Sequence, residues 1–197
     1  MWLSYAAAYT EGGGHEIDLL DAPAAKLSDY MVISKVREFE SRLVVVETST
    51  PSIYNDIKFC EKLKEAIQPD EKKIFVVLVG THVSALPEES LLLNASVNAV
   101  VQGEFDATIR ELADALDADQ DIKQVAGLWL RNGEEVIYTG SREPLSKLDD
   151  FPFVSSIYKR FLDPQQYFNP NALFPMVTIT TSRGCPYHCF FCVYPHH

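Results

Sequence analysis

Three short apolar runs, separated from one another by helical stretches, constrain the fold of this 197-residue chain most strongly. The runs are 43–46, 74–79 and 99–101, and they consist of Val, Leu, Ile, Ala and Phe. Continuous apolar runs are typical of parallel strands covered on both faces, because a strand with one wet face alternates apolar and polar residues. The alternation of strands and helices therefore predicts an α/β fold, a doubly wound parallel sheet of the flavodoxin or Rossmann type.

Other elements are predicted on either side of these runs. The alanine-rich stretch 2–10 is expected to be a helix that the glycines at 12–14 terminate. A short strand is expected at 15–21. Further along, Asn132-Gly133 lies between two apolar runs within 125–138, which is a hairpin signal.

The ends of the three apolar runs carry small, hydroxylic or glycine residues. Because the carboxyl ends of parallel strands share one edge of a sheet, and ligands of doubly wound folds bind there, we expect a ligand site at this edge. Short side chains and glycines also let a bulky cofactor approach the backbone. The candidate residues are Thr48, Ser49, Thr50, Gly80, Thr81, His82, Gly103, Glu104 and Phe105.

Three of the four cysteines lie within eight residues near the end of the chain. Cys185, Cys189 and Cys192 follow an apolar run at 174–179, which is predicted to be a strand. Their C-x3-C-x2-C spacing and odd number favour a soft metal over disulfides. Three thiolates can hold three irons of a [4Fe-4S] cluster, with the fourth iron open. Zinc is the alternative, with a histidine from His188, His196 or His197 as a fourth ligand.

The cysteine loop resembles the signature of the radical S-adenosylmethionine enzymes, a loop after the first strand of a (β/α) barrel. The resemblance implies Cys185, Cys189 and Cys192 as cluster ligands, with Phe191 beside the adenine. It also implies that S-adenosylmethionine chelates the open iron and is cleaved reductively to a 5′-deoxyadenosyl radical.

The residues before this loop resemble the cobalamin-binding domain of the cobalamin-dependent radical SAM class. The matching runs are 14–22, 48–52, 79–89 and 103–105. The resemblance implies cobalamin (B12) as a cofactor and methyl transfer to, or rearrangement of, an unactivated carbon. It further implies a small-molecule, lipid or tetrapyrrole substrate and a reductant such as flavodoxin or ferredoxin. The Asp-x-His-x-x-Gly pattern that supplies a lower axial histidine in some cobalamin proteins is not in the sequence.

The resemblance divides the chain into three parts. Residues 1–140 correspond to the cobalamin-binding domain, 141–172 to an ordered connector, and 173–197 to the start of the radical SAM domain. Since the fold it resembles begins with a central strand, the chain is expected to be a fragment, short at both ends and inactive by itself. Loss of that strand is expected to leave its neighbours unpaired.

Composition excludes some classes of function. The formal net charge of −11 opposes binding to nucleic acid or anionic membranes. There is no apolar run of 18 residues and no basic leader at the first residues, so we expect no transmembrane segment and a cytoplasmic location. Two alternatives remain open: a radical SAM enzyme with a vestigial scaffold domain that holds no cobalamin, and a zinc-stabilised binding module.

Overall fold

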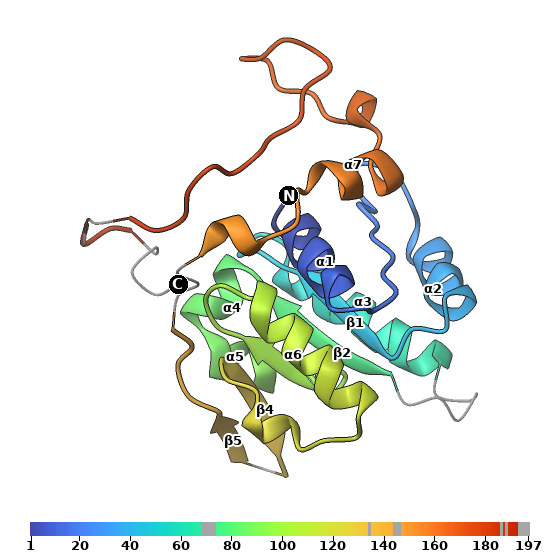
Figure 1. Cartoon of the computed structure of the whole chain (residues 1–197). Coiled ribbons are helices and arrows are strands. Elements are labelled where there is room, and N and C mark those ends of the chain that lie inside the picture. Colours follow the sequence, from blue (N-terminus) through green and yellow to red (C-terminus); the bar gives the residue numbers. More distant parts are fainter. Residues whose placement is uncertain (68–73, 134, 144–146, 186, 188, 193–197) are drawn as a thin grey trace.

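A computed structural model describes residues 1–67, 74–133, 135–143, 147–185, 187 and 189–192 (Figure 1). Its centre is a five-stranded sheet with the strand order β1-β2-β3-β4-β5. The strands are β1 (Leu43–Glu47), β2 (Phe75–Val79), β3 (Ala99–Val101), β4 (Leu128–Asn132) and β5 (Glu135–Tyr138). The three predicted apolar runs thus form three neighbouring strands.

The sheet is mixed rather than wholly parallel, which corrects the prediction. β1, β2 and β3 are parallel, with Leu43 opposite Phe75 and Val77 opposite Ala99. The predicted hairpin forms β4 and β5, and β4 pairs antiparallel with β3. The hairpin extends the sheet because Leu128 is completely buried in the same apolar cluster as β3.

Helices cover both faces of the sheet, which confirms the doubly wound arrangement. α2 (Asp29–Glu38), α3 (Ile53–Ile67) and α5 (Pro87–Leu92) contribute to an apolar cluster on one face. α1 (Trp2–Gly12) and α6 (Asp106–Asp117) contribute to the cluster on the other, in front of the sheet in Figure 1. The remaining elements are α4 (Thr81–Ala85), α7 (Ser155–Phe161) and the 3-10 turns Ile122–Gln124, Leu148–Asp150 and Pro164–Gln166.

The predicted strand at 15–21 is wrong. This segment makes no strand pairing, and among the described residues β1 pairs only with β2. An extended segment becomes a strand only where a neighbour supplies backbone partners, and side chains hold this one instead. His15 Nε2 lies 2.7 Å from Asp114 Oδ1, and Leu19 is buried in a cluster with Tyr5 and Ile157.

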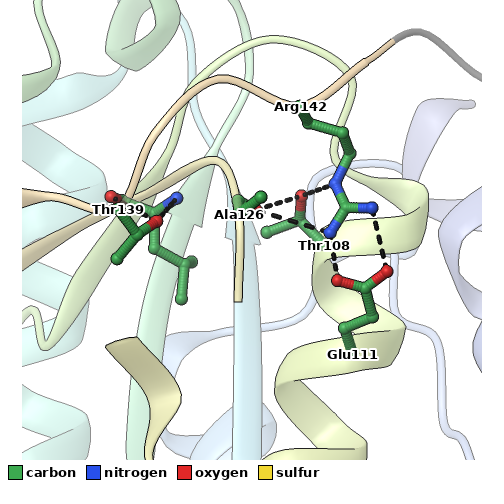
Figure 2. A network of polar contacts seen from close by, with 6 residues as sticks. Thr108, Glu111, Ala126, Thr139 and Arg142 are labelled. Atoms are coloured by element: carbon green, nitrogen blue, oxygen red, sulfur yellow. Dashed lines mark hydrogen bonds and ion pairs between the residues drawn. The ribbon is translucent and has the colours of Figure 1, made fainter. Parts of the chain in front are cut away.

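Arg142 joins the end of the hairpin to α6, as Figure 2 shows. Its Nε donates to Thr108 Oγ1 at 2.8 Å and its Nη1 donates to Glu111 Oε1 at 2.9 Å. Thr108 Oγ1 in turn donates to the carbonyl of Ala126 at 3.1 Å. The first turns of α6 are therefore fixed against the strand that extends the sheet, and with them the loop that follows β3.

The segment from α7 to the cysteines returns to α1. The side chain of Tyr158 on α7 donates to the carbonyl of Thr178 at 2.8 Å. Tyr5 on α1 accepts from the Thr180 N–H at 2.7 Å through its hydroxyl oxygen. Residues 174–179, predicted as a strand, have no regular secondary structure and pair with no strand within the described chain. Tyrosine hydroxyls rather than a neighbouring strand bind the backbone of Thr178 and Thr180.

The aromatic residues of the predicted connector differ in burial within its described ranges, 141–143 and 147–172. Tyr158 is 8% exposed, and Phe151 stacks on Tyr9 with ring centroids 4.5 Å apart. Phe153 and Phe168 are 90% and 76% exposed. In the described part of the chain, every helix is too short or too polar to cross a bilayer.

Candidate functional site

Two of the predicted site residues meet in a backbone contact at the carboxyl ends of β1 and β2. Thr48 is 3% exposed, and its N–H donates to the carbonyl of Val79 at 2.8 Å. Gly80 has φ +115°, and a Cβ placed on it would lie 2.3 Å from the Thr48 carbonyl oxygen. Only glycine fits here, because both its conformation and the space exclude a side chain. The backbones that follow the two strands are therefore in direct contact, with no space for a side chain at Gly80.

Ser84 connects the second strand end to the third. Its hydroxyl donates to the carbonyl of Gly80 at 2.8 Å and accepts from the Gly103 N–H at 3.0 Å. The side chain is buried, as Ser84 is 1% exposed. The sequence analysis did not select Ser84 as a site residue, although a small hydroxylic residue four positions after a glycine at a strand end was the available signal.

A second set of polar contacts lies at the same edge. Thr50 Oγ1 and His82 Nδ1 are 3.2 Å apart, which joins the loops after β1 and β2. The hydroxyls of Ser49 and Ser52 are 3.0 Å apart, and Thr48 Oγ1 donates to Asp56 Oδ2 at 2.6 Å. Thr50 and Thr81 are exposed. The edge thus presents short polar groups that are already ordered by one another.

The end of β3 places its predicted residues in different environments. Phe105 is 7% exposed and belongs to the apolar cluster under α1 and α6. Glu104 is partly exposed, and its Oε2 lies 3.7 Å from Arg183 Nη1. Gly103 takes φ +79° and donates to Ser84, as described above. Phe105 therefore anchors the loop in the core, while Gly103 and Glu104 lie nearer the surface.

Arg183, two residues before the first cysteine of the loop, is bound to the start of α6. Its Nη1 is 2.5 Å from Asp106 Oδ2 and its Nη2 is 3.2 Å from Asp106 Oδ1. Burial alone lowers the pKa of Arg183, but the hydrogen bond and charge of Asp106 and the charge of Glu104 outweigh it and raise that pKa. The guanidinium remains charged, and it ties the segment just before the first cysteine to the start of α6.

Cys185 and Cys189 of the loop are free thiols, and the three cysteines differ in exposure. Cys185 and Cys189 are exposed and Cys192 is partly exposed, and the Cys192 N–H donates to the Cys189 carbonyl at 2.9 Å. Among the described residues, no group of three or more His, Cys, Asp or Glu side chains is gathered closely enough to hold a metal ion. His188, His196 and His197, the histidines of the zinc alternative, lie outside the described residues. Phe191 is 79% exposed and meets Phe190 edge to face.

The residues present fit the two cofactors by their chemistry. Cys185 and Cys189 are free thiols, and the described residues around them have no regular helix or strand that would resist convergence of the cysteines. At the strand edge, Gly80 and Gly103 carry no side chain and Thr50 is exposed, which leaves backbone and hydroxyl groups accessible to a flat ligand.

The fold and this edge define an α/β cofactor-binding domain. Residues 1–113 match the family model of the B12 binding domain, and the chain belongs to that family. This match confirms the cobalamin-binding domain recognised from the sequence motifs.

Curated relatives cover nearly the whole chain. The chain is 29% identical over 178 residues to an uncharacterized methyltransferase of Pyrococcus horikoshii, covering 90% of this chain and 37% of the relative. It is 27% identical over 200 residues to an anaerobic magnesium-protoporphyrin IX monomethyl ester cyclase of Rubrivivax gelatinosus, covering 97% and 34%. The chain thus spans about a third of the length of these relatives.

Solved structures share the fold. The cobalamin-dependent S-adenosylmethionine radical enzyme OxsB, with aqua-cobalamin and S-adenosylmethionine bound, has a TM-score of 0.65 at 12% identity, over 73% of this chain and 20% of that one. The radical S-adenosylmethionine methyltransferase TsrM from Kitasatospora setae, with cobalamin and a [4Fe-4S] cluster bound, has a TM-score of 0.63 at 16% identity, over 77% and 28%.

Proposed function

We propose that this chain is the cobalamin-binding part of a cobalamin-dependent radical SAM enzyme that transfers a methyl group to, or rearranges, an unactivated carbon. The observation that carries the proposal is the edge formed by Thr48, Gly80 and Gly103. It lies within the residues that match the B12 binding domain, and the contact of Arg183 with Asp106, three residues after Gly103, supports a cysteine loop near it.

The loops after β1, β2 and β3 are the proposed cobalamin contacts. Thr48, Ser49, Thr50, Gly80, Thr81 and His82 supply the first two loops, and Gly103, Glu104 and Phe105 supply the third. Thr50 and His82 hold each other at 3.2 Å, so the two loops present one ordered surface to a ligand. Preordered polar groups lower the entropy lost on binding.

Cys185, Cys189 and Cys192 are the proposed ligands of a [4Fe-4S] cluster, and Phe191 is proposed to lie beside the adenine of S-adenosylmethionine. When bound, the cluster supplies the electron that cleaves S-adenosylmethionine. A relative named as a methyltransferase supports methyl transfer, and a relative named as a cyclase shows that not every relative bears a methyltransferase name. Full activity is proposed to need more residues than this chain has, so the chain alone is expected to be inactive.

The proposal extends to partners and location. The substrate is a small molecule, a lipid or a tetrapyrrole, and the electron donor is flavodoxin or ferredoxin. A reducing cytoplasm would keep the three cysteines of the loop reduced and available for iron. The net charge of −11 is unfavourable for nucleic acid as a partner.

The test is an anaerobic titration of the purified chain with hydroxocobalamin, followed by gel filtration and the visible absorption of the protein fraction. Near-stoichiometric retention is expected. Thr50→Trp should reduce retention, because it fills the edge with a large side chain. The matched control is Asn132→Trp, since Asn132 is exposed at the end of β4 and so at the opposite edge of the sheet.

The outcomes separate the alternatives. If a chain that unfolds cooperatively retains no cobalamin, the cobalamin proposal is rejected. That result would favour the alternative of a scaffold domain that holds no cobalamin. Equal losses for Thr50→Trp and Asn132→Trp would show that the site is not at the proposed edge.

A further inference from the structure

Arg183 belongs to the cysteine loop, yet its side chain is buried against another part of the molecule. The side chain is 9% exposed, whereas Ser182, Gly184 and Cys185 on either side of it are exposed. An arginine side chain in an exposed, irregular segment is normally exposed to solvent. Its burial requires partners that compensate for the lost hydration.

The carboxylate of Asp106 is the main partner. It is the first residue of α6, its side chain is 5% exposed, and both of its oxygens face the guanidinium at 2.5 and 3.2 Å. Such a two-point contact fixes orientation as well as distance. The contact stabilises Asp106 as well as Arg183, because burying a carboxylate without a cation beside it costs free energy.

Three aromatic rings complete the surroundings of the guanidinium. The centroids of Trp2, Tyr5 and Phe151 lie 5.7, 5.6 and 5.0 Å from Arg183 Cζ. Aromatic faces attract cations, and more strongly where water is excluded. Trp2 and Tyr5 come from α1, Phe151 from the connector and Asp106 from α6, so three other parts of the chain meet at the Arg183 side chain.

We propose that Arg183 is a positioning residue, which locks the three-cysteine loop to the carboxyl-end edge of the sheet through Asp106 and the rings of Trp2, Tyr5 and Phe151. Asp106 lies three residues after Gly103, and Cys185 lies two residues after Arg183. The contact therefore limits how far the first thiol can move from the end of β3. A role for this contact in positioning the iron-sulfur cluster relative to cobalamin rests on the proposed function. The contact between Arg183 and its partners does not.

Trypsin tests the lock directly, because it cleaves after arginine only when the side chain is free to enter the protease. The bond between Arg183 and Gly184 should resist cleavage in the native chain, although the segment is extended. The bond between Lys147 and Leu148 in the connector should be cut quickly, since Lys147 is exposed. The cleavage rates of the two bonds are followed by mass spectrometry without cobalamin or iron.

Asp106→Asn should raise the rate of cleavage after Arg183 by about tenfold or more, because it removes the charged partner. Asp106→Glu, which restores the carboxylate, should return much of the protection. The matched control is Asp114→Asn on the same helix, which removes the partner of His15 and should leave cleavage after Arg183 unchanged.

A second readout is the fluorescence of Trp2. In a Trp129→Phe background Trp2 is the remaining tryptophan. Asp106→Asn and Arg183→Gln should shift its emission in the same way, because each removes the cation from the ring. If Asp106→Asn unfolds the chain, Phe151→Leu decides the matter. It leaves the start of α6 intact and should raise cleavage after Arg183 by about threefold.

Rapid cleavage after Arg183 in the native chain would overturn the proposal, and so would protection that Asp106→Asn and Phe151→Leu both leave unchanged in folded protein. Failure of the cobalamin titration with Arg183 still protected would reject the proposed function and leave the lock standing. Retention of cobalamin together with rapid cleavage after Arg183 would reject the lock and leave the proposed function standing.

Discussion

The Cα of Gly80 lies so close to the carbonyl oxygen of Thr48 that a Cβ on Gly80 would be 2.3 Å from that oxygen. Gly80→Ala is therefore expected to separate the ends of β1 and β2 and to destabilise the domain by more than about 1 kcal/mol. The measurement is urea unfolding followed by far-UV circular dichroism.

The control for this prediction is Gly140→Ala. Gly140 has φ +99°, but nothing lies within 4 Å of the Cβ that it would gain. Gly140→Ala thus reports the cost of the backbone conformation alone. If Gly140→Ala lost as much stability as Gly80→Ala, the contact with Thr48 would not contribute to the effect of Gly80→Ala.

Arg142→Ala is expected to destabilise the fold by about 1.5–3 kcal/mol, because it leaves Thr108 and the Ala126 carbonyl without a charged donor. The side chain of Arg142 is 17% exposed, whereas that of Arg160, which pairs with Glu11, is 47% exposed. Arg160→Ala should therefore cost about 0–1 kcal/mol. Urea unfolding midpoints compare the stability of the two variants. Equal losses of stability would contradict the prediction that the more buried ion pair contributes more.

The four thiols should differ sharply in reactivity. Burial raises the pKa of Cys60 to about 12, and its side chain is inaccessible. Iodoacetamide at pH 8 should alkylate Cys185 and Cys189 in the native chain and reach Cys60 only after unfolding in guanidinium. Cys60→Ser should leave the fast phase unchanged. Mass spectrometry of tryptic peptides identifies each site, and rapid labelling of Cys60 in folded protein would contradict the prediction.

Glu47 should make stability depend on pH. Burial raises its pKa above the ordinary value of 4.5. The folded chain therefore holds that proton more tightly than the unfolded one, so this group's contribution to stability is lost as pH rises from about 4.5 through the raised pKa. Glu47→Gln cannot lose a proton, so it removes this pH-dependent loss of stability. The difference between the Tm of Glu47→Gln and that of the native chain should therefore increase from pH 4 to pH 7. A difference in Tm that is constant with pH would contradict the assignment.

Cys185→Ala tests the metal site. After anaerobic incubation with iron and sulfide, the native chain is expected to retain about four irons with acid-labile sulfide, and Cys185→Ala much less. Cys60→Ala is the control, because Cys60 lies in the core away from the loop. Zinc without acid-labile sulfide in the native chain would favour the zinc-stabilised module instead.

The sequence was sufficient to predict the elements whose signals are local. The strands at 43–47, 75–79 and 99–101 were predicted from continuous apolar runs, and the hairpin from Asn132-Gly133. The three candidate strand ends do lie at one edge, since parallel pairing follows from the alternation of strand and helix.

Features that depend on distant partners escaped prediction. Residues 15–21 have a strand-like composition but no neighbouring strand in the described chain. The run 174–179 has none either, and the hydroxyl of Tyr158 binds its Thr178 carbonyl while that of Tyr5 binds Thr180 just after it. The bridge made by Ser84 and the pairing of Arg183 with Asp106 join residues 19 and 77 positions apart, respectively. No periodicity in a single sequence encodes such contacts.

The surroundings of Arg183 have a consequence for the order of assembly. The last strand of the sheet ends at Tyr138, 45 residues before Arg183. At about 5–20 residues per second, synthesis of those residues takes about 2–9 s. Small mixed α/β domains fold faster than that. We therefore expect the sheet and Asp106 at the start of α6 to be folded before the arginine leaves the ribosome, so that the thiols after it reach a surface that has already formed.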